Sequence, residues 1–149
     1  MVKESHAHKG TSFLEIYQNC NIFNDGAFEE YTGKEKLDNV IELENDKPML
    51  FARETKGIKL EGSKAIVVSM DDCSTEDLLV HDETDLDMAH IIANWTSNPQ
   101  LPEPIGVIYC VDRPTYNQDM VDQINSAKKK KGKGSVQGLL NAGDTWVVD

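Results

Sequence analysis

The chain has 149 residues, of which 39% are hydrophobic and 28% are charged, and its formal net charge is −11. This length and composition predict a single soluble domain with one modest core rather than a disordered segment. The acidity argues against nucleic acid as a partner, because binding to the phosphate backbone needs a basic face. No apolar stretch reaches the length of a membrane span, and residues 1–8 lack the apolar core of a signal peptide, so no membrane partner is expected.

The three cysteines lie at positions 20, 73 and 110. They are too few and too dispersed for a disulfide framework, and they are consistent with a reducing, cytoplasmic environment. Cys110 lies inside an apolar run and Cys73 in an acidic loop, and both are interpreted as structural thiols. Cys20 by itself carries no metal-ligand spacing, so the residues alone also allow a half-buried structural thiol there.

The first elements predict a helix, a strand and a loop. A helix is expected over residues 2–8, and an apolar run over 13–17 predicts a strand. The chain then becomes polar around Cys20, and residues 24–26 supply a turn. In a parallel α/β sheet, ligands bind at loops that leave the carboxyl ends of strands, so this pattern places Cys20 on a loop of that kind.

The middle of the chain predicts a β-rich segment after a short helical turn at residues 26–32. Two apolar runs, 40–43 and 49–52, surround a turn that contains proline and predict a pair of strands. Further short runs at 58–60 and 65–68 extend this segment as a small antiparallel region. We therefore expect a β-rich excursion attached to an α/β core.

The second half predicts helices around one more strand. Ser74 followed by Asp77 is typical of a helix start, and a clearer helix follows Asp85. Its buried face is predicted from the helical spacing of four apolar residues, Met88, Ile91, Ile92 and Trp95.

The continuous apolar run at 105–111 is typical of a strand covered on both faces. An amphipathic helix is expected over 117–130, with Met120, Val121 and Ile124 facing inward. The last residues, 135–149, predict a short docked helix and an extended end around Trp146.

Four segments, taken in order, resemble the β subunit of the 2-oxoacid:ferredoxin oxidoreductases, most closely the 2-oxoglutarate branch. They are YQNCNIFNDGAF, LDNVIELENDKPMLF, LLVHDETD and PEPIGVIYCVDRPTY, and the resemblance extends over about residues 9–129. Because several separated segments match in the same order, an unrelated acidic α/β domain is the least favoured alternative.

The resemblance implies a subunit that holds thiamine diphosphate with Mg²⁺ and a [4Fe–4S] cluster on four cysteines. Cys20 occupies the motif of the last of those cysteines, and Asn21, Asn24 and Asp25 are weaker candidates near the cluster or the thiamine. The family's other three cysteines and its Gly-Asp-Gly metal–diphosphate segment lie upstream and have no counterpart here. We therefore expect the C-terminal part of a β subunit, whether through a truncation, a split gene or a partial record, that alone is inactive and holds no cofactor.

The expected fold class is α/β, as the C-terminal half of a thiamine-diphosphate-binding domain with a small β-rich insertion. Residues 1–21 would end the cofactor-binding core, and residues 22–95 would form a C-terminal domain with the β-rich segment and helices. Residues 96–130 would return to the α/β core as a strand and helix, and residues 131–149 would form a tail.

The function implied by the resemblance is oxidative decarboxylation of a 2-oxoacid to an acyl-coenzyme A, with electrons passed through the cluster to ferredoxin. The expected partners are the α subunit and the N-terminal half of the β subunit. The choice of 2-oxoglutarate over pyruvate rests on similarity alone. The alternative is a non-catalytic interaction module that binds the partner subunit. In either case a core cut in two should expose apolar surface, which predicts aggregation or obligate association.

One further cluster invites a metal hypothesis, namely His81, Asp82 and Glu83 with Asp85 and His90. The two histidines are not one helical turn apart, as a zinc hydrolase motif requires. A capped and solvated junction between two helices explains the same residues better.

Overall fold

The structure is a computed structural model that describes residues 1–96 and 98–148. The chain divides into two compact units. The first, called the core unit, comprises Met1–Ala7 and Ser12–Val111; the second, called the tail unit, comprises His8–Thr11 and Asp112–Asp149.

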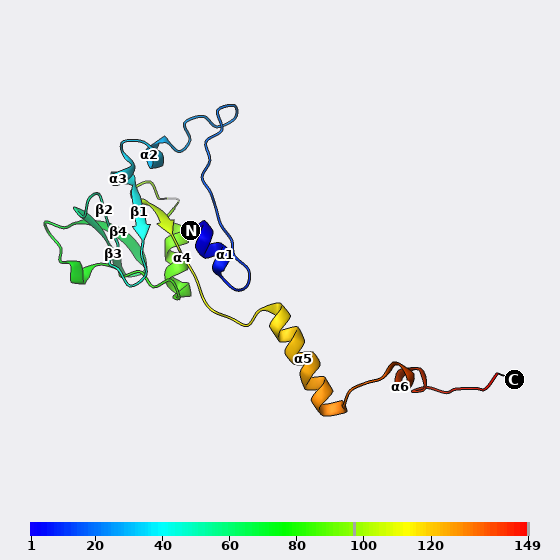
Figure 1. Cartoon of the computed structure of the whole chain (residues 1–149). Coiled ribbons are helices and arrows are strands. Elements are labelled where there is room, and N and C mark those ends of the chain that lie inside the picture. Colours follow the sequence, from blue (N-terminus) through cyan, green and yellow to red (C-terminus); the bar gives the residue numbers. More distant parts are fainter. Residues whose placement is uncertain (97, 149) are drawn as a thin grey trace. The chain divides into compact units, whose positions relative to one another are not determined.

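The core unit combines short helices with two small sheets, so the expected mixture of helices and strands is confirmed (Figure 1). Its helices are α1 (Val2–Ala7), α2 (Glu29–Thr32), α3 (Lys36–Asn39), the 3₁₀ turn η1 (Thr75–Asp77) and α4 (Leu86–Trp95). Its strands are β1 (Val40–Leu43), β2 (Leu50–Phe51), β3 (Lys56–Glu61), β4 (Lys64–Ser69) and β5 (Glu103–Gly106).

The predicted antiparallel region is confirmed as the sheet β2-β3-β4, in which β3 and β4 form a hairpin with Glu61 opposite Lys64. The predicted pairing of residues 40–43 with 49–52 is wrong, although both runs form strands. Strand β1 instead pairs in parallel with β5, with Val40 opposite Glu103.

The run at 49–52 makes its backbone hydrogen bonds elsewhere: Leu50 lies opposite Gly57 in the ladder with β3, and residues 47–49 also bond to residues 79–81. The N–H of Met49 donates to the carbonyl of Leu79 at 2.8 Å, and the N–H of His81 donates to that of Lys47 at 2.9 Å. These groups are therefore already paired, and β1 finds its partner in a strand about sixty positions further on.

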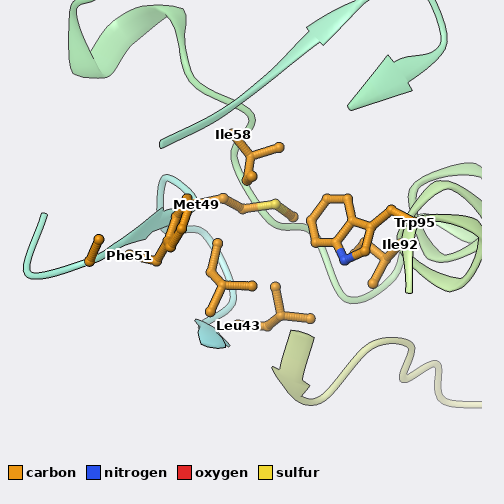
Figure 2. Packing of buried hydrophobic residues seen from close by; sticks show 8 residues of the cluster. Leu43, Met49, Phe51, Ile58, Ile92 and Trp95 are labelled. Carbon is orange, nitrogen blue, oxygen red and sulfur yellow. The ribbon is translucent and has the colours of Figure 1, made fainter. Parts of the chain in front are cut away.

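The buried core lies where β1, β2, β3 and α4 meet. Figure 2 shows Met49 extending between Phe51 and the indole of Trp95, with Ile58 close to it. The predicted helix after Asp85 is confirmed as α4, and Ile92 and Trp95 on its inner face are 0% and 3% exposed. The Asp85 side chain caps this helix by accepting from the N–H groups of Asp87 and Met88 at 2.8 and 3.2 Å.

The expected strand at residues 13–17 is not formed. Phe13 and Ile16 are 91% and 70% exposed, and no strand of the described residues pairs with this segment. An isolated extended run cannot satisfy its backbone groups or bury its side chains, so β-propensity alone does not make a strand there.

The strand expected over residues 105–111 is shorter than predicted, because β5 ends at Gly106. This glycine has a φ of +132°, which turns the backbone away from the ladder. Beyond it, the chain is held by the loop at residues 81–83: the N–H of Cys110 donates to the carbonyl of Glu83 at 2.7 Å. The helix expected to begin at Ser74 is also shorter than predicted, since Ser74 caps only the single turn η1.

The tail unit contains α5 (Tyr116–Lys131) and α6 (Val136–Leu140). The helix predicted over residues 117–130 is therefore confirmed, and Thr115 caps it by accepting from the N–H of Gln118 at 3.2 Å. Within the described part of the tail unit, nothing covers Met120, Val121 and Ile124, which are 38–51% exposed. The inward face expected for this helix and the docking expected for the last one stay predictions. Of the helices described, none combines the length and the apolar character that crossing a bilayer requires.

Candidate functional site

Residues 17–28, called the Cys20 loop, are closed by contacts that are nested one inside the next. Innermost, the N–H of Asn24 donates to the carbonyl of Cys20 at 2.8 Å. Around this pair, Asn19 accepts from the N–H of Gly26 at 2.9 Å and donates to the carboxylate of Asp25 at 3.0 Å. The loop therefore has a defined shape without belonging to a sheet.

Two aromatic rings close the outer end of the Cys20 loop. The rings of Tyr17 and Phe28 are stacked, with centroids 5.0 Å apart and planes inclined by 8°, and Tyr31 lies beside Tyr17 at 6.5 Å. Such ring pairs stabilise a loop beyond the area that they bury. The turn predicted at residues 24–26 is confirmed, with Gly26 in the left-handed region at a φ of +77°.

The Cys20 thiol is free and partly exposed. The backbone N–H groups of Phe23 and then Ile22 lower the pKa of this thiol below its ordinary value, because they favour the thiolate. Partial desolvation opposes this effect, and Asn24 adds a smaller lowering of the same pKa. The loop therefore favours the nucleophilic and metal-binding form of the residue.

This environment predicts that Cys20 ionises at lower pH in the folded chain than in the same chain unfolded in urea. The expected result is faster alkylation of Cys20 at neutral pH in the folded state, since the thiolate is the reacting species. The measurement is the iodoacetamide reaction rate against pH, read at the peptide that contains Cys20. A folded profile that lies at or above the pH of the unfolded one would contradict the proposed role of the N–H groups.

A pocket of about 500 Å³ lies beside the loop. It is lined by residues of the loop, of its approaches, and of two distant segments, namely Glu15, Ile16, Tyr17, Gln18, Cys20, Asn24, Phe28, Tyr31, Thr96 and Glu103. The hydroxyl of Tyr17 donates a hydrogen bond to the carboxylate of Glu103, which is only 7% exposed. This hydrogen bond, with burial and the Glu103 charge, raises the pKa of Tyr17 well above its usual range.

The four residues that the sequence singled out lie on this one loop, but they are placed differently. Cys20 and Asn24 line the pocket, and Asn21 is exposed beside a second hollow that Cys20 shares. Asp25 is bound to Asn19 within the loop.

Sequence reasoning missed Asn19, Tyr17 and Glu103. The last two lie 86 positions apart, so no local spacing could join them, although both belong to the segments that carry the family resemblance.

Metal-binding side chains do not cluster in the part of the chain that the structure describes, where no three of the His, Cys, Asp and Glu residues could hold an ion together. His81 is not solvated as expected: it is 1% exposed, and its Nε2 lies 2.7 Å from the carbonyl of Val107. It therefore joins the end of the β5 segment to the loop before α4.

No family model and no solved structure matches this chain. The chain is, however, similar to the 2-oxoglutarate oxidoreductase subunit KorB of Mycobacterium tuberculosis, with 29% identity over 159 aligned positions. The alignment covers 100% of this chain and 41% of the relative, so the chain spans less than half of that subunit's length. The resemblance to a β subunit of this kind, expected from the sequence, is confirmed.

Proposed function

We propose that this chain is the C-terminal part of the β subunit of a 2-oxoacid:ferredoxin oxidoreductase and supplies Cys20 as one ligand of a [4Fe–4S] cluster. The assembled enzyme would join a 2-oxoacid, with 2-oxoglutarate as the first choice, to coenzyme A. It would release CO₂ and two electrons, which ferredoxin accepts one at a time. Thiamine diphosphate with Mg²⁺ supplies the electron sink for decarboxylation when it is bound, and the cluster supplies the electron path.

The observation that carries this proposal is the environment of the Cys20 thiol. Iron–sulfur clusters are held by thiolates, and the loop lowers the pKa of this thiol through its backbone N–H groups while leaving the residue partly exposed. N–H groups directed at a cysteine sulfur also tune the potential of a bound cluster. The similarity to the mycobacterial subunit over the whole chain supports the same assignment.

Among the described residues, Cys20 could supply one thiolate ligand, which is enough to bind one of the four irons of such a cluster. One thiolate does not hold four irons, and no group of three metal-binding side chains is present among these residues. The proposal therefore assigns the remaining cysteines to the N-terminal half of the β subunit, and the chain's own task is to hold one thiolate at a fixed position. Likewise, the thiamine site would be completed by that half.

The test is anaerobic iron–sulfur reconstitution of this chain alone and together with the N-terminal part of the mycobacterial relative. We expect iron, sulfide and visible absorbance to appear only in the pair. Cys20→Ser should abolish or strongly weaken them, whereas Cys73→Ser, a matched change of a second partly exposed thiol, should leave them unchanged. A well-assembled pair whose cluster is indifferent to Cys20→Ser would remove the ligand assignment.

A second candidate function is a non-catalytic module that binds a partner subunit. The observation in its favour is apolar exposure near the site, since Phe13, Ile22 and Phe23 are 84–91% exposed. Exposed side chains of this kind mark surfaces that bind other proteins. The same reconstitution separates the two functions. If the two chains assemble and the cluster is unaffected by Cys20→Ser, the result supports the module.

A further inference from the structure

We propose that Tyr17 is a positioning residue for Cys20, because its hydroxyl holds the Cys20 loop on Glu103 at the start of β5. This inference rests on the proposed function only for the identity of the group that Cys20 binds. It concerns how the chain keeps a thiol in place on a loop without regular secondary structure.

The nested contacts within the loop fix its shape but not its place on the core unit. The pairs Cys20–Asn24 and Asn19–Gly26 join residues that are at most seven positions apart. The hydrogen bond from Tyr17 to Glu103 spans 86 positions, the longest separation among the side-chain hydrogen bonds described for this loop. It therefore connects the loop to a distant segment of the same unit, the strand β5.

The Glu103 end of this contact is well fixed. Glu103 is the first residue of β5 and lies opposite Val40 in the parallel ladder with β1. Glu103 as a whole residue is only 7% exposed, and a carboxylate shielded from water requires a donor. The Tyr17 hydroxyl supplies that donor, so the two ends of the contact depend on each other.

The Tyr17 ring joins the two ends of the loop. Tyr17 lies three residues before Cys20, and its ring is stacked on Phe28 at the far end of the loop. Fixing one ring therefore fixes the entrance and the exit of the loop together. Cys20 and Glu103 also line the same pocket, so the tie lies beside the thiol that it positions.

The first experiment measures Cys20 in the full chain without any cluster. Tyr17→Phe keeps the stacked ring but removes the donor, and Tyr31→Phe removes a neighbouring hydroxyl for which the described residues offer no hydrogen bond. We expect a spin label on Cys20 to become more mobile in Tyr17→Phe, because the loop keeps its nested contacts but loses its attachment to Glu103. Tyr31→Phe should behave as the unchanged chain does.

A double variant covers the case in which Tyr17→Phe fails to fold because it leaves a buried carboxylate unpaired. Tyr17→Phe with Glu103→Leu removes both partners, which avoids that penalty, and should show the same loss of positioning in a folded chain. Glu103→Gln keeps an acceptor oxygen and should largely preserve the low mobility of the label. A folded double variant with an immobile label would overturn the proposal.

The second experiment repeats the comparison in the reconstituted pair, with the midpoint potential and the electron paramagnetic resonance spectrum as readouts. We expect both to change in Tyr17→Phe and not in Tyr31→Phe. If the label on Cys20 becomes mobile in Tyr17→Phe while the cluster ignores Cys20→Ser, the positioning role stands and the ligand role falls. If the cluster needs Cys20 but Tyr17→Phe changes nothing in either experiment, the ligand role stands and the positioning role falls.

Discussion

Replacing Gly106 by alanine is expected to lower the free energy of unfolding by about 2–5 kcal/mol. Gly106 ends β5 with a φ of +132°, a conformation that residues with a Cβ rarely adopt. A Cβ at this position would also lie 2.6 Å from the carbonyl oxygen of Leu43, its partner in the parallel ladder. Backbone atoms cannot rotate aside as a side chain can, so the two strands would have to separate.

The measurement is urea unfolding of Gly106→Ala, with Gly62→Ala as the matched control. Gly62 also has a positive φ, +64°, but a Cβ there meets nothing within 4 Å. The control should therefore lose only the conformational part, about 1–2 kcal/mol. Equal losses in the two variants would show that a Cβ placed against the Leu43 carbonyl costs no free energy of unfolding beyond the conformational part.

Replacing Ile92 by alanine is expected to cost roughly 2–5 kcal/mol, because a buried side chain is removed and the surrounding core only partly collapses. Ile92 is 0% exposed and belongs to the buried cluster that joins α4 to β1, β2 and β3. Figure 2 shows it beside Trp95 on the same helix. Its loss would weaken the attachment of α4 to both sheets.

The control for Ile92→Ala is Leu86→Ala on the same helix. Leu86 is 49% exposed at the first turn of α4, so its truncation removes little buried area and should cost well under half as much. Circular dichroism during thermal and urea unfolding measures both variants. If the two variants lose the same stability, α4 is not held to the core by its Ile92 face.

The two predicted effects also bear on the site. Gly106 and Glu103 belong to the same four-residue strand, and Glu103 receives the hydrogen bond from Tyr17. Because β5 is held by its ladder to β1, the stability of the β1–β5 pair and the placement of the Cys20 loop should be linked. The mobility of a spin label on Cys20, measured in the same variants, reports this link directly.

The sequence by itself determined the elements whose signals are local. Apolar spacing predicted α4 with Ile92 and Trp95 inside, and short apolar runs predicted the antiparallel region that β3 and β4 form. The turn at residues 24–26 followed from its glycine, and the family resemblance of the segment around Cys20 followed from the order of its residues. For the helix, the strands and the turn, the residues that favour each element lie next to one another in the sequence.

Only the tertiary structure decided which segments pair and which stay unpaired. The run at residues 13–17 has the propensity of a strand but no partner in the described chain. The run at 40–43 pairs with the distant strand β5, while the run at 49–52 is bonded to β3 and to Leu79. The contact between Tyr17 and Glu103 likewise joins two residues that no local pattern connects. Backbone and buried polar groups are satisfied by whichever partner the fold brings close, and that choice depends on all segments at once.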